Sequence, residues 1–129
     1  MKTRIIVGVT LLIAVLGLGT YASRAAEVSG RQQWTIVNIM DPTLVKDAVV
    51  MGPVLIVHDD AKMARGLPCT SFYRFDAAKG PQDEVVSFHC TPAMRKIAGQ
   101  LTVTRTDKNP VIGIARVTEY QFAGDCEAH

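Results

Sequence analysis

The sequence lacks the short motifs that identify common enzyme classes. It contains no G-x-S-x-G nucleophile elbow and no glycine-rich phosphate loop, so nothing in it supports a serine hydrolase or a nucleotide-binding enzyme. It also has no C-x-x-C and no C-x-x-C-H motif, which excludes the thioredoxin arrangement and covalent haem attachment. Neighbouring acids such as Asp59-Asp60 and Asp83-Glu84 fall in predicted turns, where capping and solvation explain them. We therefore favour a non-catalytic protein.

Aromatic residues are scarce, at 6% of the 129 residues, and charged residues make up 20%. Hydrophobic residues nevertheless reach 48%, which is too apolar for a disordered chain. The length corresponds to one domain. No repeat or long Pro/Gly linker divides it, so we expect a single β-rich domain over residues 33–129, preceded by a flexible lead over 26–32.

The start of the chain has the pattern of a signal peptide. Lys2 and Arg4 precede an apolar or small run over residues 5–19, which is shorter than the roughly 20 residues that a membrane-spanning helix needs. Ser23 and Ala25 place small residues three and one before a cleavage point. The sequence therefore predicts export to the periplasm of a bacterium or to the extracellular space. An uncleaved leader that anchors the protein in a membrane is the alternative.

The predicted cleavage changes the charge of the protein. Removing residues 1–25 takes away three of the 14 basic residues and none of the 12 acidic ones, so the net charge falls from +2 to about −1. The remaining basic residues are spread singly along the chain. A nucleic-acid partner needs a clustered positive face, and the sequence therefore argues against one.

The apolar residues come in short runs bounded by Asp, Pro and Gly, which is typical of strands. The run over residues 48–57 is nearly continuous and predicts a strand buried on both faces, interrupted or bulged at Gly52-Pro53. Two hairpins are expected in the second half of the chain. The predicted strands cover residues 34–40, 48–57, 68–75, 84–90, 101–106 and 111–122, with hairpins formed by the third and fourth runs and by the fifth and sixth.

Three short helical turns are predicted between the strands. Each follows a residue that can cap a helix, in the pairs Asp41-Pro42, Asp60-Ala61 and Thr91-Pro92. Gly66 and Gly99 stand where left-handed caps would end the second and third turns. The predicted fold class is mainly β, a small antiparallel sandwich or partly open barrel with helical turns at its corners. An α+β arrangement is the alternative.

Three cysteines in an exported chain indicate one disulfide and one free thiol, or an intermolecular bond. If Phe75 lies opposite Glu84 in the first hairpin, Cys69 falls directly opposite Cys90, close to the separation that a disulfide needs. We therefore predict a structural Cys69–Cys90 disulfide and a free Cys126. Pairing through Cys126, or no bond at all, remains open.

A cluster of soft ligands suggests an alternative, metal-binding function. His58 closes the buried strand, Met63 lies in the turn after it, and His89 comes from the first hairpin, so the three could converge on copper or another transition metal. A cupredoxin-like loop would carry a histidine between its Cys and its Met, and the segment from Cys90 to Met94 has none. Met63 is also readily explained as core filler and His58 as a hydrogen-bonded residue.

The segment Cys126-Glu-Ala-His129 has the C-x-x-H spacing of a metal site, but two ligands cannot close one. Trp34 and Tyr73 could line a ligand patch. The favoured function is thus a small exported binding module without a cofactor, whose partner is a protein or a small ligand. A periplasmic metal-binding or redox domain is the alternative.

The leader gives a direct test. The exported protein is expected to begin at Ala26, because cleavage after Ala25 satisfies the small-residue rule. The intact mass of the exported product, measured by mass spectrometry, checks this. A mass that includes residues 1–25 would show a retained leader and a membrane-anchored protein.

Overall fold

The computed structural model describes residues 30–129, so the predicted signal peptide and residues 26–29 lie outside the described part. The prediction of a mainly β fold is confirmed, with a sheet that does not close on itself. The elements are β1 (Gln32–Val45), β2 (Ala48–Asp59), α2 (Asp60–Ala64), β3 (Thr70–Asp76), β4 (Gly80–Phe88), β5 (Ala93–Met94), β6 (Thr102–Arg105), β7 (Ala115–Gln121) and β8 (Glu127–Ala128). No helix within the described residues is long and apolar enough to cross a membrane.

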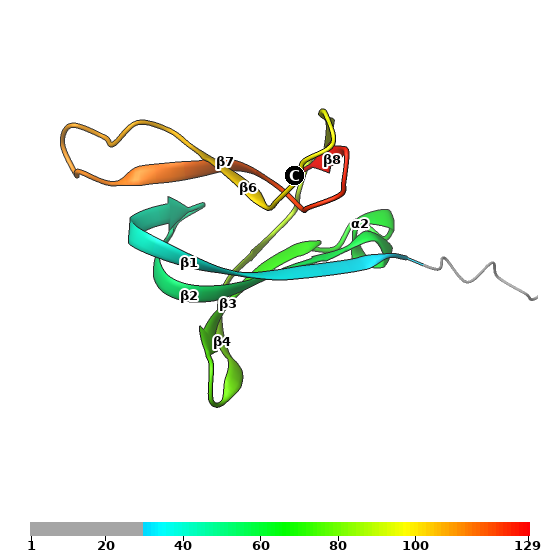
Figure 1. The fold of residues 1–129 in the computed structure, drawn as a ribbon, viewed down its shortest axis with the longest axis horizontal. Coiled ribbons are helices and arrows are strands. Elements are labelled where there is room, and N and C mark those ends of the chain that lie inside the picture. The colour runs from blue at the N-terminus through cyan, green and yellow to red at the C-terminus, as the bar shows by residue number, and fades with distance from the viewer. Residues whose placement is uncertain (1–29) are drawn as a thin grey trace, which may run out of the picture.

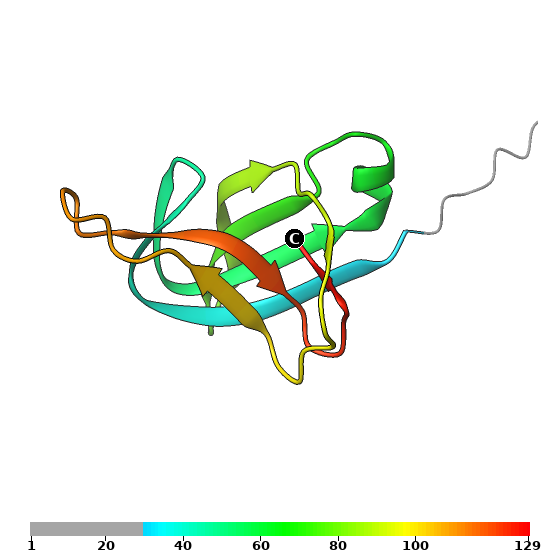
Figure 2. The ribbon, with the colours of Figure 1, turned by 90° about the horizontal axis from the view of Figure 1, so that it is seen from above.

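The sheet is folded into two layers. Its strand order is β4-β3-β2-β1-β7-β8-β5, and β6 pairs with β7. Strands β1 to β4 form one antiparallel layer, and the β6–β7 hairpin lies across β1 and β2 as the second (Figure 1, Figure 2). The layers are continuous because the end of β1 pairs in parallel with β7, at Thr43 and Leu44.

A third hairpin, between β1 and β2, replaces the predicted helical turn at Asp41-Pro42, which was wrong. The chain stays extended to Val45 and reverses in a tight turn at Lys46, whose φ is +56°. The pairing of β1 with β2 shifts register beside Gly52, which has a φ of +86° that glycine tolerates without a side-chain clash. The predicted irregularity at Gly52-Pro53 is therefore present, as a bulge.

The hydrophobic core lies between the two layers. Side chains of a strand alternate between faces, so the even-numbered residues of β2 point inward and Val54 and Ile56 are fully buried. Phe72 of β3 and Tyr120 of β7 meet them from either side. The buried apolar cluster comprises Ile39, Val45, Val50, Val54, Ile56, Phe72, Tyr120 and Phe122.

The expectation that β2 is buried on both faces is wrong. Its odd-numbered residues point away from the second layer, and Val49 and Met51 are 53% and 62% exposed. No strand or helix of the described chain covers this side of the β1–β4 layer (Figure 1). The continuous apolar run in the sequence therefore reflects one core face and one exposed apolar face.

Of the other two predicted helical turns, only the one at Asp60 is present. It forms α2, and its N-cap is Asp59, whose carboxylate accepts a hydrogen bond from the backbone N–H of Lys62. The turn predicted at Thr91-Pro92 is wrong. The N–H groups of Arg95 and Ala98 pair instead with carbonyls of the 125–126 segment, so tertiary pairing overrides the local capping signal.

The core makes a clear prediction for stability. Phe72→Ala is expected to lower the free energy of unfolding by about 3–5 kcal/mol, because this fully buried ring packs between Phe88 and Tyr120 and leaves a cavity when removed. Met40→Ala, at a side chain that is 76% exposed, is the control and should change it by less than about 0.5 kcal/mol. Urea denaturation measures both values, and equal losses would contradict this placement of the core.

Candidate functional site

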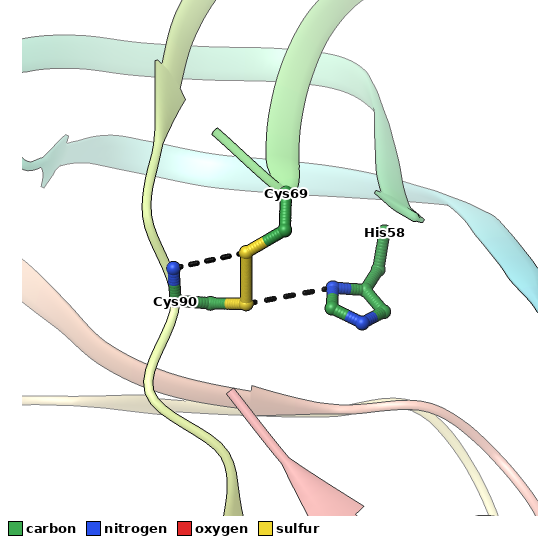
Figure 3. A group of neighbouring side chains, drawn as sticks. All are labelled: His58, Cys69 and Cys90. Atoms are coloured by element: carbon green, nitrogen blue, oxygen red, sulfur yellow. Dashed lines mark hydrogen bonds between the residues drawn. A yellow bond between two sulfur atoms is a disulfide. The ribbon is translucent and has the colours of Figure 1, made fainter. Parts of the chain in front are cut away.

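Cys69 and Cys90 form a disulfide, with Cα atoms 6.2 Å apart, at one end of the core (Figure 3). The hairpin register differs from the predicted one, because Thr70 pairs with Phe88 and β4 ends there. Cys90 therefore reaches Cys69 from just beyond the strand rather than from a position directly opposite. Cys126 is free in the described chain.

His58 lies beside this disulfide and is fully buried (Figure 3). It is the last inward-facing position of β2, so it continues the core face of Val54 and Ile56. Its Nδ1 is 3.6 Å from Cys90 Sγ, and its Nε2 is 2.8 Å from Oδ1 of Asp60 in α2. Both ring nitrogens thus have a neighbour inside the protein.

The predicted metal set of His58, Met63 and His89 does not assemble. Met63 does approach, since its Sδ lies 3.8 Å from Cys90 Sγ. His89 does not, because β3 separates β2 from β4 and the His89 side chain is exposed. The sulfur of Cys90, which lies between His58 and Met63, is bound in the disulfide.

A second buried histidine, which the predicted metal set missed, stacks on His58. The rings of His58 and His129 have centroids 3.8 Å apart and an angle of 28° between their planes. His129 is placed by backbone hydrogen bonds in both directions with Tyr120, next to β8. Its Nε2 lies 3.6 Å from Oε1 of Glu127. The C-x-x-H spacing pointed to this segment, although Glu127 and His129, rather than Cys126, are the residues that reach His58.

His129 has no hydrogen-bond partner for either ring nitrogen among the described residues, although it is only 8% exposed. Burial, and after it the neighbouring His58, lower its pKa to about 4. The ring is therefore neutral at pH 7, with a free lone pair in a site that water reaches poorly. We call His58, Asp60, Glu127 and His129 the histidine cluster.

One cation and a further acid flank the histidine cluster. Arg31 lies between two carboxylates, 3.4 Å from Asp60 Oδ2 and 3.2 Å from Asp125 Oδ2. Burial acts to raise the pKa of Asp125, but hydrogen bonds from Gln33 and from the N–H of Glu127, together with the charge of Arg31, lower it overall. The acids around the cluster thus outnumber its one arginine.

A cavity of about 170 Å³ opens beside the cluster, lined by His129, Cys90, His89 and Tyr120 among others. Tyr120 closes its inner wall: the hydroxyl is hydrogen-bonded to Thr70, and burial raises the pKa of the phenol. His89 therefore lies on the cavity wall rather than with His58. Of the histidine cluster, His129 is the member that lines this cavity.

A second feature lies on the opposite side of the β1–β4 layer. Large apolar side chains of β1 and β2 are exposed there, namely Trp34 (65%), Ile36 (44%), Met40 (76%), Val49 (53%) and Met51 (62%). Tyr73 joins this face from β3, since it pairs with Leu55, which itself pairs with Ile36. Trp34 and Tyr73, the predicted ligand patch, therefore do share a surface. We call it the outer face.

No protein-family model, no curated protein and no solved structure matches this chain, so comparison with known proteins does not indicate its function. Its function must therefore be argued from its own residues. The histidine cluster and the outer face are the two features that packing of the core does not explain.

The disulfide at the cluster gives a test with an internal control. Replacing Cys69 and Cys90 together by alanine is expected to lower the free energy of unfolding by about 2–4 kcal/mol, because the bond restricts the unfolded chain. Cys126→Ala should leave it nearly unchanged, since this thiol is free. Non-reduced peptide mapping and urea denaturation check both points. A disulfide that contains Cys126 would contradict the pairing.

Proposed function

We propose that the protein is a small exported binding module that docks a protein partner through its outer face. The observation that carries this proposal is that the outer face is apolar and that its large side chains on two adjacent strands, β1 and β2, are exposed. Monomeric soluble proteins rarely expose contiguous apolar patches of several strands' width, and such patches commonly mark interaction sites.

The register of the sheet makes the patch contiguous. Trp34 pairs with Val57 and Ile36 pairs with Leu55, so side chains of β1 and β2 stand next to one another on this face. The outward residues of these three strands are mostly uncharged, with Asp59 at the end of β2 as an exception. The uncharged ones include Trp34, Ile36, Asn38, Met40, Val49, Met51, Pro53, Leu55, Val57, Ser71, Tyr73 and Phe75.

The chemistry of the patch favours a protein over a membrane or a nucleic acid. Trp, Tyr and Met are enriched in the cores of protein interfaces, where charged residues are depleted. Anionic lipid and nucleic acid both attract clustered Lys and Arg. The nearest strand beyond Tyr73 instead presents Glu84, which pairs with it at the edge of the sheet.

We include export in the proposal because both the N-terminal sequence and the disulfide favour it. The first 25 residues have the composition of a signal peptide. The Cys69–Cys90 disulfide suits an oxidising compartment such as the periplasm or the extracellular space. A partner would accordingly be sought outside the cytoplasm.

Site-specific photo-crosslinking in producing cells tests the outer face. A photoreactive amino acid at Met51 is expected to give a covalent adduct of defined mass with one other protein, because this side chain is 62% exposed at the middle of the patch. The same amino acid at Val111, which is 90% exposed but lies in the β6–β7 loop, is the matched control and should give none.

A substitution on the face makes the test specific. Trp34→Asp should abolish the Met51 adduct while leaving the thermal unfolding of the domain close to wild type, since Trp34 is 65% exposed. Adducts that persist with Trp34→Asp, or that form equally from Val111, would overturn the proposal. An adduct between two copies of this chain would replace the separate partner by self-association.

A further inference from the structure

We infer that the histidine cluster is a binding site for a divalent transition-metal ion of the Zn²⁺ type, with His58, Glu127 and His129 as its ligands. This site lies between the two layers, whereas the outer face lies on the far side of the β1–β4 layer. The inference therefore does not depend on the proposed protein-binding function. It also differs from the predicted copper set, with which it shares only His58.

The spacing of the polar atoms already resembles a coordination sphere. Adjacent ligands of an ion with bonds of about 2.0–2.1 Å lie about 2.9–3.4 Å apart. His58 Nε2 and Asp60 Oδ1 are 2.8 Å apart, and Glu127 Oε1 and His129 Nε2 are 3.6 Å apart. One ligand atom from each of His58, Glu127 and His129 lies within 4.8 Å of the other two. The Glu127–His129 pair is thus close to a ligand spacing, and Asp60 holds the ring of His58 from outside this group of three.

His129 is the observation that points to a ligand rather than to packing alone. Buried polar groups are nearly always hydrogen-bonded, yet both nitrogens of this ring lack a hydrogen-bond partner among residues 30–129. A bound cation would satisfy one nitrogen directly.

The charge around the cluster suits a cation. Glu127 supplies one carboxylate to the group of three, and Asp60 contacts His58 through Oδ1 while Arg31 interacts with its Oδ2. A set of two imidazoles and one carboxylate is a ligand set that Zn²⁺ accepts, and Cu²⁺ also binds such nitrogen and oxygen donors. The cavity of about 170 Å³ lies directly beside His129.

The nearby sulfurs offer the competing set. A ligand atom from each of His58, Cys69 and Cys90 also lies within 4.8 Å of the other two, but both thiols are held in the disulfide. Metal binding by that set would require a thiol reductant to break the bond first. Metal binding to the oxidised protein would therefore assign the site to the histidine cluster rather than to the cysteines.

Zn²⁺ titration of the oxidised protein, without reductant and in competition with a chromophoric chelator, tests the inference. We expect one Zn²⁺ per chain and a rise in the thermal unfolding temperature on addition of the ion, since a ligand that binds only the folded state stabilises it. Imidazole resonances of both His58 and His129 should shift in the NMR spectrum of the wild-type protein on the same titration. Absence of binding to the oxidised wild type overturns the inference.

Two variants and one control assign the ligands. Glu127→Gln and His129→Gln are each expected to weaken Zn²⁺ binding by about tenfold or more. Glu127 is the safer variant for folding because its side chain is 28% exposed. His89→Gln, at the exposed histidine on the wall of the same cavity, should bind Zn²⁺ as the wild type does.

Two outcomes would overturn this ligand set. Unchanged affinity in Glu127→Gln together with unmoved His129 resonances would remove β8 from the site. Binding that appears only after reduction, with a thiolate-to-metal charge-transfer band when Co²⁺ replaces Zn²⁺, would move the site to His58, Cys69 and Cys90. A tenfold loss with Glu127→Gln in the oxidised protein supports the inference even if His129→Gln does not fold.

Discussion

The bend of β1 at its bulge is the constraint on which the two layers depend. Up to Ile39 the strand pairs with β2 inside the first layer, and beyond the register shift Thr43 pairs both with Val50 of β2 and with Ala115 of β7. Gly52 makes the shift possible, because it takes a positive φ on the opposite strand. The β6–β7 hairpin is thereby carried over the β1–β2 strands, where it covers their inner face. Everything else in the core, including the burial of Phe72 and Tyr120, follows from that crossing.

The sequence was a good guide to the strands where alternation and turn residues agreed. The run over 48–57, the hairpin that follows Cys69 and the irregularity at Gly52-Pro53 are all present. It was a poor guide at Asp41-Pro42 and Thr91-Pro92, where a capping residue before proline suggested helix. In both segments backbone pairing to distant residues decides the conformation, and a local signal cannot report such pairing. The last strand, β8, has two residues and leaves no periodic pattern at all.

The same distinction between local and long-range pairing applies to the residues of the candidate sites. Spacing within the first hairpin was enough to pair Cys69 with Cys90, because two thiols near the ends of adjacent strands meet even when the register is one residue off. The position of His89 depended on which strands are neighbours, and β3 lies between β2, which carries His58, and β4, which His89 follows. The contact between His58 and His129 joins residues 71 positions apart through the crossing of the layers, and no local pattern encodes it.

Both candidate features arise from one inversion of the usual pattern along β2. An exposed sheet face ordinarily carries polar side chains and a core face apolar ones. Here the outward positions include Val49 and Met51, and the last inward position is His58. Exposed apolar area stays hydrated and so adds nothing to the stability of the isolated domain, and a buried imidazole stabilises it less than an apolar side chain of the same size would. The packing of the domain therefore explains neither the apolar outer face nor the buried His58. A protein partner would bury the exposed apolar side chains on one side of β2, and a cation would bind to His58 on the other side. β2 would then contribute residues to both binding sites.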